Sequence, residues 1–286
     1  MAWGTPTSRG TLSNTAAPTS GPVTSVTVAQ NSLIVVVGGL ALNSPTITCS
    51  DSAGNTYTVV KQTDTAPNPD ISAFMAYATA ATALSAGTVT VAWGGGAAGS
   101  VVCEVFEVTG AATSGFNDSA VTAQQNASGT SPSTTSGTPG ESGELFFAVD
   151  ITDSTSATWT EDTGNGWTTA RAKTLSVSAP SMCIGASYLV NSGVGTKTWA
   201  PTTAADEHCI ILLGFKVLNT GAAAQTLAAL TNAGAGALAL TGSAAQTLSA
   251  LTQSSVIAKR IRPKRGGLDA ASDLRRFRYA WAVRGF

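Results

Sequence analysis

Short runs of apolar and β-branched residues recur along the first three quarters of the chain, and each run is followed by a cluster of Gly, Asn, Asp, Pro or Ser. Val, Ile and Thr fit a pleated, half-buried surface, and branching at Cβ disfavours a helix. Runs of this length and spacing, with no helical period between them, predict an all-β sandwich. The predicted strands are Ser25–Ala29, Leu33–Leu40, Thr46–Ser50, Thr56–Gln62, Ser72–Ala78, Gly87–Trp93, Val101–Val108, Leu145–Ile151, Ala157–Thr160, Leu175–Val177, Met182–Val190, Lys197–Trp199 and Cys209–Lys216.

Two of these runs are apolar at every position, namely Leu33–Val37 and Ile210–Leu213. A strand with one wet face alternates between apolar and polar residues, as Lys197–Ala200 does. We therefore expect the two uniform runs to be central strands that are covered on both faces or that face a neighbouring subunit. Between the two strand-rich halves, residues Gly115–Gly143 form a long polar connection, for which we expect either a functional loop or a simple crossover.

Charge divides the chain into three zones. Residues 1–216 contain 6 basic and 14 acidic residues, residues 217–258 contain no charged residue, and residues 259–286 contain 9 basic and 2 acidic residues. The net charge of −1 is therefore a cancellation between an acidic body and a basic end. We expect an N-terminal arm over residues 1–24, a β-sandwich over 25–216, an uncharged Ala/Thr/Gly-rich arm over 217–258 and a basic anchor over 259–286.

The uncharged zone contains a repeat. Gly221–Ala233 (GAAAQTLAALTNA) recurs as Gly242–Ser254 (GSAAQTLSALTQS). Two copies are too few for a self-sufficient solenoid, so we expect this arm to pack on other subunits or on a neighbouring protein. Its conformation stays open, because Leu227 and Leu230 have helical spacing whereas nearby leucines alternate as in a strand.

Composition excludes several classes of protein. Charged residues make up only 11% of the chain and apolar residues 43%, which argues against disorder driven by charge and against a coiled coil. The longest apolar run, Leu33–Leu42, is half the length of a membrane span, and polar residues interrupt the uncharged zone throughout. The first residues lack the basic and apolar regions of a secretory signal. We expect neither a signal peptide nor a membrane partner.

The order of these features resembles a jelly-roll-type β-sandwich module that occurs in virion proteins of tailed bacteriophages and in some bacterial surface proteins. The resemblance covers residues 25–216, and the A-Q-T-L-x-A-L-T units of the arm are similar to those of phage structural proteins. It is carried by the apolar strand Leu33–Leu40, the polar turn Asp51–Tyr57, the segment Met75–Gly87 before Thr88–Trp93, the strand Val101–Val108, and then Gly143–Val149, Trp159–Trp167 and Ile210–Lys216.

This resemblance implies a fold and a class of function. The fold would be an antiparallel jelly-roll-type sandwich followed by the extended arm and a short C-terminal helix. The function would be that of a non-enzymatic virion component, either a head decoration, neck or collar, or tail accessory protein. Its partners would be capsid, portal or tail proteins together with further copies of the same chain. Such a protein is assembled in the bacterial cytoplasm and resides in the virion.

The basic end predicts an amphipathic helix after an extended basic run. Asp269 can cap the helix, Gly285 can end it, and Pro263 prevents a helix through the preceding Lys259–Arg265. Leu, Phe and Trp on one stripe are typical interface anchors, while the arginines lie away from that stripe. The expected partner-docking residues are Arg260, Arg262, Lys264, Arg265, Leu274, Arg275, Phe277, Arg278 and Trp281.

Docking on a protein is the interpretation that we favour for this end, because it follows a repeat that itself needs partners. The alternatives are phosphate groups of a nucleic acid, a membrane surface, and the chain's own acidic body. We expect neither a nucleic acid nor a membrane as the partner of this end.

The sequence offers little support for catalysis. The single histidine, His208, begins an apolar strand, where adjacent residues point to opposite faces. Glu104 and Glu107 lie on opposite faces of one strand, so they cannot form the facing carboxylates of a glycosidase. Other pairs, such as Asp150 with Glu161, stay open. We expect a protein that is not an enzyme and that has no cofactor.

Two further candidate sites compete with structural interpretations. Asp51 and Asn55 resemble calcium ligands, with Asp153, Glu161 and Asp162 as helpers, but Asp, Gly and Asn are also the residues that a β-turn requires. We favour the turn and expect no metal. Trp159 and Trp167 flank a Gly-Asn-Gly sequence and could stack on sugar rings, which makes a carbohydrate-binding or adhesin module the alternative function. Tryptophan is also common in sandwich cores, and we favour the core.

The four cysteines each lie within a predicted strand, and no two of them form a C-x-x-C pair. This placement favours small buried apolar residues. Disulfides that form after release into an oxidising environment remain the alternative.

Overall fold

The computed structural model describes residues 3–15, 19–63, 71–110, 117–154, 157–171, 176–178, 181–190, 193–203 and 206–216. All the described residues belong to one compact unit. The expected repeat arm at 217–258 and the basic anchor with its helix at 259–286 lie outside the described residues.

The described residues form an all-β structure in which all strand pairings are antiparallel, as the spacing of apolar runs predicted. Within them the structure contains no helix that could cross a membrane. The elements are β1 (Thr7–Asn14), β2 (Ser20–Val28), β3 (Leu33–Leu40), β4 (Thr46–Asp51), β5 (Thr58–Thr63), β6 (Ser72–Thr79), β7 (Leu84–Gly94), β8 (Val101–Val108), β9 (Asn117–Gly129), β10 (Thr134–Thr135), β11 (Leu145–Thr152), the 3-10 turn η1 (Thr163–Asn165), β12 (Thr168–Arg171), β13 (Ser176–Ser178), β14 (Ser181–Val190), β15 (Thr198–Trp199) and β16 (Asp206–Phe215).

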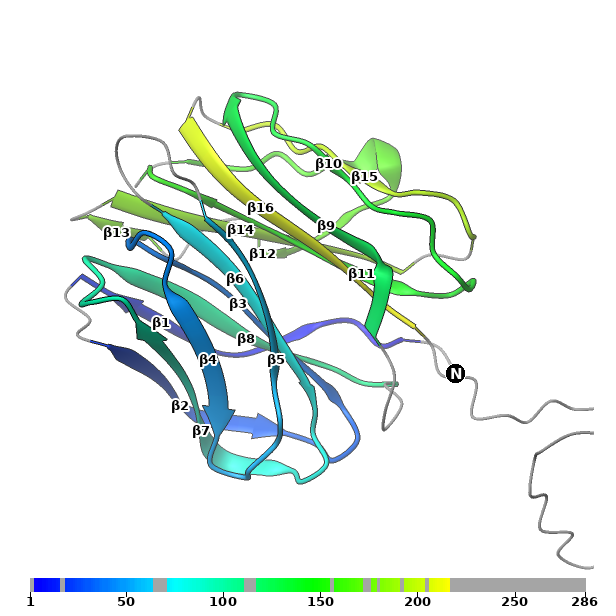
Figure 1. The fold of residues 1–286 in the computed structure, drawn as a ribbon. Helices are drawn as coiled ribbons and strands as arrows, with labels where there is room; N and C mark the ends of the chain where they lie inside the picture. The colour runs from blue at the N-terminus through cyan, green and yellow to red at the C-terminus, as the bar shows by residue number, and fades with distance from the viewer. Residues whose placement is uncertain are drawn as a thin grey trace, which may run out of the picture. The chain divides into compact units, whose positions relative to one another are not determined.

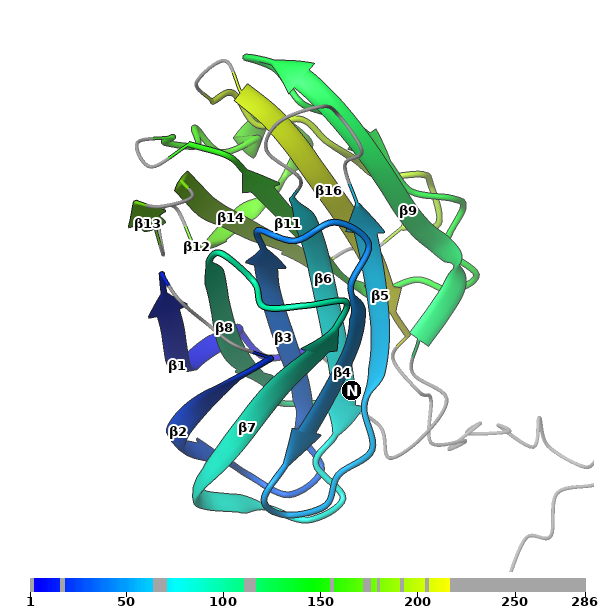
Figure 2. The same ribbon diagram turned by 60° about the vertical axis from the view of Figure 1, so that its left-hand side comes forward.

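Three sheets lie in successive layers (Figure 1, Figure 2). The first has the strand order β2-β7-β4, and the second has the order β1-β8-β3-β6-β5. The third has the order β12-β14-β11-β16-β9, with β13 also paired to β14. The short pair β10-β15 and the segment after β11 lie over the outer face of the third sheet, where Trp167 and Trp199 join its apolar cluster.

The central strands β8, β3 and β6 of the middle sheet are buried on both faces. In β3, Leu33, Val35 and Val37 pack toward the six-stranded sheet, whereas Ile34 and Val36 pack toward the three-stranded sheet. The uniformly apolar β16 is likewise covered on both sides, which the sequence predicted for these two strands. The covering layers come from the same chain.

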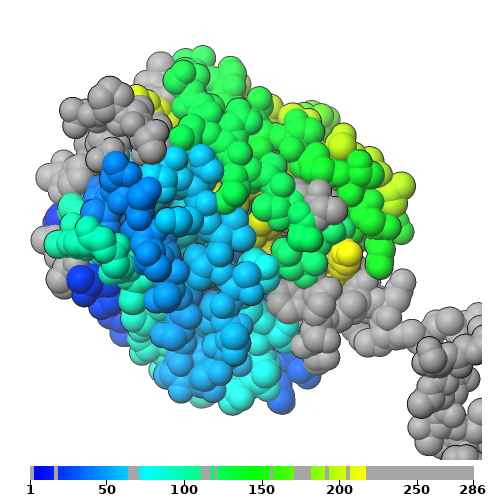
Figure 3. Space-filling view, viewed as in Figure 1, coloured from blue at the N-terminus to red at the C-terminus, as the bar shows by residue number. Residues whose placement is uncertain are grey.

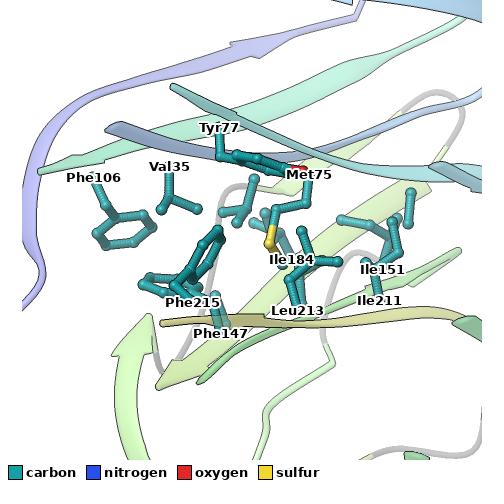
Figure 4. Close-up of a cluster of buried hydrophobic side chains, with 14 of the residues drawn as sticks. Val35, Met75, Tyr77, Phe106, Phe147, Ile151, Ile184, Ile211, Leu213 and Phe215 are labelled. Atoms are coloured by element: carbon teal, nitrogen blue, oxygen red, sulfur yellow. The ribbon is translucent and has the colours of Figure 1, made fainter. Parts of the chain in front are cut away.

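The core between the two large sheets joins the halves of the body. Phe106 of β8 packs on Phe147 of β11 with ring centroids 5.4 Å apart, and Tyr77 of β6 meets the edge of Phe215 at 5.3 Å. Figure 4 shows these rings converging from the two sheets, with Met75 between the layers. Both halves therefore bury their apolar side chains in one shared core.

Amide side chains connect the edges of these two sheets. Gln62 of β5 donates to the Oδ1 of Asn126 on β9 (2.7 Å), and Asn126 donates in turn to the carbonyl of Thr63 (3.0 Å). Gln124 also donates to the carbonyl of Lys61. In Figure 3 the blue-to-cyan surface of the first half meets the green surface of the second half.

The sequence missed strands that lie at sheet edges. Residues 117–129, expected as part of a long connection, form β9, and the expected N-terminal arm at 1–24 contributes β1 and the start of β2. Edge strands carry polar side chains, so they lack the apolar pattern that identifies central strands. The expected strand at 157–160 is not a strand, because only the isolated bridge between Thr160 and Thr202 forms there.

Two residues of the β2-β7 pair have a left-handed backbone. Ser25 has a φ of 60° and Ala86 a φ of 51°, and the register shifts on both sides of Val26. A side chain at Cβ makes this conformation unfavourable, and glycine adopts it without that cost.

We expect Ala86→Gly to raise the free energy of unfolding by about 0.5–1 kcal/mol, because it relieves the strain at φ 51°. Ala92→Gly in the same strand is the control, and it should lower the stability by a similar amount, since Ala92 does not have a positive φ. Urea unfolding measures both. Destabilisation by Ala86→Gly would contradict the assignment of strain.

Candidate functional site

The candidate residues of the basic end, Arg260 to Trp281, lie outside the described residues. The structure places the other candidates, namely Asp51 with Asn55, the tryptophans, His208 and the four cysteines.

Asp51 organises a turn after β4. Its Oδ1 accepts the backbone N–H groups of Ala53 (2.9 Å) and Asn55 (3.1 Å), and its Oδ2 accepts from the Asn55 amide and the Tyr57 hydroxyl, both at 2.9 Å. The Asn55 side chain also exchanges two 3.0 Å hydrogen bonds with the backbone of Thr82. Both carboxylate oxygens are thus occupied by donors of the protein, the arrangement of an Asx-type turn. Among the described residues no group of three or more His, Cys, Asp or Glu side chains could hold a metal ion.

The two tryptophans proposed for sugar stacking have different surroundings. Trp167 is 2% exposed, packs on Trp199 with ring centroids 6.2 Å apart, and donates to the carbonyl of Thr198 at 2.7 Å. It is a core residue of the outer layer. Trp159 is half-buried and lies against β14, where a Cβ on Gly185 would come within 2.6 Å of its ring.

The Trp159 indole contacts a buried polar pair, Asp150 and His208. Its Nε1 donates to Oδ2 of Asp150 (2.7 Å), and the same oxygen lies 2.8 Å from Nδ1 of His208. The other ring nitrogen of His208 lies 3.1 Å from the carbonyl oxygen of Gly129. Asp150 and His208 are both fully buried.

This geometry fixes one proton of His208. A carbonyl oxygen only accepts, so Nε2 must donate to Gly129. Oδ2 of Asp150 accepts from the Trp159 indole and shares a second hydrogen bond with Nδ1 of His208. With both nitrogens hydrogen-bonded, His208 has no free nitrogen with which to activate a nucleophile.

Glu161 and Asp162 attach the outer layer to the six-stranded sheet. Glu161 accepts from the hydroxyls of Ser187 (2.7 Å) and Thr169 (2.8 Å) and from the Trp199 indole (3.3 Å). Asp162 accepts the backbone N–H of Ala200 at 2.9 Å and caps η1. Asp150 and Glu161, the carboxylates that the sequence left open as a pair, each accept hydrogen bonds from donors of the protein.

The two glutamates of β8 lie on opposite faces, as predicted. Glu107 accepts from the Ser32 hydroxyl (2.7 Å), the Ala29 N–H (2.8 Å) and the guanidinium of Arg9. Burial alone would raise the pKa of Glu107, but these hydrogen bonds and the charge of Arg9 outweigh burial and lower it. Glu104 is fully buried on the same face as Phe106.

Sequence reasoning treated His208 as an ordinary strand-edge residue and missed its partner. Asp150 belongs to β11, the strand paired with β16, and it lies 58 residues from His208 in the sequence. The available signal was that each is an ionisable residue inside an otherwise apolar strand.

All four cysteines are free thiols and lie in strands, as the sequence predicted. Burial raises the pKa of the Cys49 and Cys103 thiols to about 12, with a smaller contribution from the charge of Asp51 at Cys49. These thiols are therefore protonated, and unreactive as nucleophiles, at neutral pH.

We expect Asp150→Asn to lower the free energy of unfolding by about 1–3 kcal/mol, because it removes the carboxylate oxygen that shares a buried hydrogen bond with Nδ1 of His208. His208→Gln should also destabilise the protein, and the double variant should cost less than the sum of the two, since both remove the same interaction. Urea unfolding measures all three. Glu141→Gln, at an exposed carboxylate, is the control and should change the stability little. Strict additivity would contradict the pair.

We expect Cys103 to react with an aromatic disulfide reagent at least roughly a hundredfold more slowly in the folded protein than an exposed thiol at pH 8, because it is buried and its pKa is raised. Thr48→Cys, on an exposed position of the neighbouring sheet, is the matched control. Denaturant should release all four thiols for reaction. Equal rates at Cys103 and at the introduced thiol would contradict the buried placement.

Comparisons of the chain with family models, with curated proteins and with solved structures give no match. Its function is therefore inferred from its own residues and their geometry.

Proposed function

We propose that the protein is a non-enzymatic structural component of a tailed-bacteriophage virion, which displays a β-sandwich and docks on the particle through its C-terminal segment. One observation carries the proposal, the division of charge into an acidic body, an uncharged zone of 42 residues that contains a repeat, and a basic end. In a head decoration, neck or collar, or tail accessory protein, these three parts would serve as a displayed domain, a connection and an anchor.

We also propose that residues 7–108 have the jelly-roll topology. An eight-stranded jelly roll has its first, eighth, third and sixth strands in one sheet and the others in the second. The orders β1-β8-β3-β6 and β2-β7-β4 support this proposal. The body departs from the pattern at β5, which pairs with β6 instead of β4. The six-stranded sheet is then an addition that covers the free face of the jelly roll.

The outer face of the three-stranded sheet supports close packing with neighbouring subunits. Thr46, Thr48 and Ser50 of β4 are exposed beside Thr90 and Ala92 of β7. The only charged residue of β2, β4 and β7 is Asp51, which the turn already uses. Neighbouring copies of an acidic body repel one another least across such an uncharged surface.

Docking would use the C-terminal segment. The apolar side chains of Leu274, Phe277 and Trp281 would enter a groove of a capsid, portal or tail protein, and the nearby arginines would pair with acidic groups of that partner. Several copies acting together would hold firmly although each arm binds weakly. The protein would then assemble in the bacterial cytoplasm and remain in the virion.

A carbohydrate-binding or adhesin function is the second proposal, and one side chain carries it. Since Trp167 and Trp199 are core residues, a stacked sugar would depend on Trp159, which is half-buried and hydrogen-bonded to Asp150.

We expect deletion of residues 259–286 to abolish incorporation into particles, and simultaneous Leu274→Ala, Phe277→Ala and Trp281→Ala substitutions to reduce it strongly, because both remove the docking side chains. Arg276→Lys, which lies away from the apolar stripe and outside the docking set, is the control and should be incorporated normally. The measurement is the amount of the protein in purified particles. Full occupancy without residues 259–286 would overturn the proposed anchor.

A further inference from the structure

Three ionisable side chains from different strands meet at one end of the six-stranded sheet. Asp118 lies near the start of β9, Glu144 directly precedes β11, and Lys216 directly follows β16. The register brings them together, because Gly214 pairs with Asp118 and Leu145 pairs with Phe215.

The contacts orient these groups toward one another. Nζ of Lys216 lies 3.6 Å from Oδ1 of Asp118, and Oδ2 of Asp118 accepts the backbone N–H of Gly140 at 3.1 Å. Glu144 is hydrogen-bonded to Asp118 and also accepts the backbone N–H of Glu141 at 3.2 Å. Asp118 and Glu144 are buried, whereas the Lys216 side chain is 30% exposed.

An ordinary ion pair does not account for this group. One lysine faces two buried carboxyl groups, so a single positive charge stands against two acidic groups.

Glu144 gains and loses its proton near neutral pH. Burial, followed by the charge of Asp118 and the hydrogen bond to it, raises the pKa of Glu144 to about 7, although the Glu141 N–H and the charge of Lys216 act in the opposite direction. A protonated Glu144 beside Asp118 and Lys216 brings an acid, a carboxylate and an amine together.

Gly140 covers this group closely. A Cβ at this position would lie 3.5 Å from Oδ2 of Asp118 and 3.9 Å from Nζ of Lys216. The backbone of Gly140 therefore lies beside both groups, and its N–H holds Oδ2 of Asp118 in place.

We propose that Lys216 and Asp118 condense to an intramolecular isopeptide bond, with Glu144 as the proton carrier. The ammonium group of Lys216 first gives one proton to the Asp118 carboxylate. The neutral Nζ then attacks Cγ of Asp118, a C–N bond forms and a C–O bond breaks. Glu144 gives its proton to the leaving oxygen and takes the second proton from Nζ. An ammonium and a carboxylate thus yield an amide and one water molecule, and Glu144 is unchanged.

The bond would connect two neighbouring strands at the point where the chain continues into residues 217–286. Asp118 belongs to β9 and Lys216 follows β16, which is paired to β9. A pulling force on the C-terminal segment would then pass into β9 through a covalent bond. The proposal does not depend on the proposed virion function.

The test is the mass of the full chain, purified folded, and the peptides that it yields on digestion. The intact mass should be lower by one water molecule than the mass of the same linear chain, and digestion should yield a branched peptide that contains Asp118 and Lys216. Trypsin should not cleave after Lys216. A folded chain with the full linear mass, or with a mass loss that maps to other residues, overturns the proposal.

Three variants test the proposed bond and the role of Glu144 independently. Lys216→Arg keeps the positive charge and should restore the linear mass, whereas the control Lys197→Arg, at another lysine of the body, should keep the loss of water. Glu144→Gln should also lose the bond, with circular dichroism showing that the fold is retained. A mass deficit that survives Lys216→Arg overturns the bond itself. If the Glu144→Gln variant loses water as fast as the unsubstituted chain, the role of Glu144 is overturned.

Discussion

The body of this protein depends on one constraint: the three central strands of its five-stranded sheet, β8, β3 and β6, are buried on both faces. One face of β3 requires the three-stranded sheet, and the other requires the six-stranded sheet of the second half. Burial of apolar surface is the dominant favourable term in folding, and it is lost wherever a covering layer is absent. The two halves therefore share one hydrophobic core although a long polar connection separates them in the sequence, and the ring pair Phe106–Phe147 lies within that core.

Ionisable side chains are few in this chain, and the body buries a large share of its carboxylates. Asp150, Glu107 and Glu161 accept hydrogen bonds from indole, hydroxyl and backbone donors, and each connects elements that the apolar core alone would not position. A buried carboxylate is costly unless it is hydrogen-bonded, so these networks also specify which strands are neighbours. One consequence is a surface with little charge, on which threonine and serine dominate the three-stranded sheet. Such a surface suits assembly with neighbouring subunits.

The residues of the candidate sites were visible one by one in the sequence, but their groupings were not. His208 was identified as the single histidine, and Asp150 as a carboxylate within an apolar strand. Their contact requires the register between β11 and β16, and that register depends on how two distant runs align in one sheet. The group of Asp118, Glu144 and Lys216 was missed for the same reason. Lys216 follows the closing apolar strand, and nothing in the local sequence relates it to a polar connection nearly a hundred residues earlier.

The sequence by itself determined the all-β class, the central strands and the division of charge. β-Branched runs bounded by turn residues predict strands through local sterics and burial, and the bounds of β3 and β8 were predicted as they are found. Tertiary structure decided the edge strands β1 and β9, the order of the sheets and every contact between polar groups. The physical reason is that an edge strand is held by hydrogen bonds to its neighbour rather than by an apolar pattern of its own. Cross-strand pairs, likewise, exist only once the layers have packed.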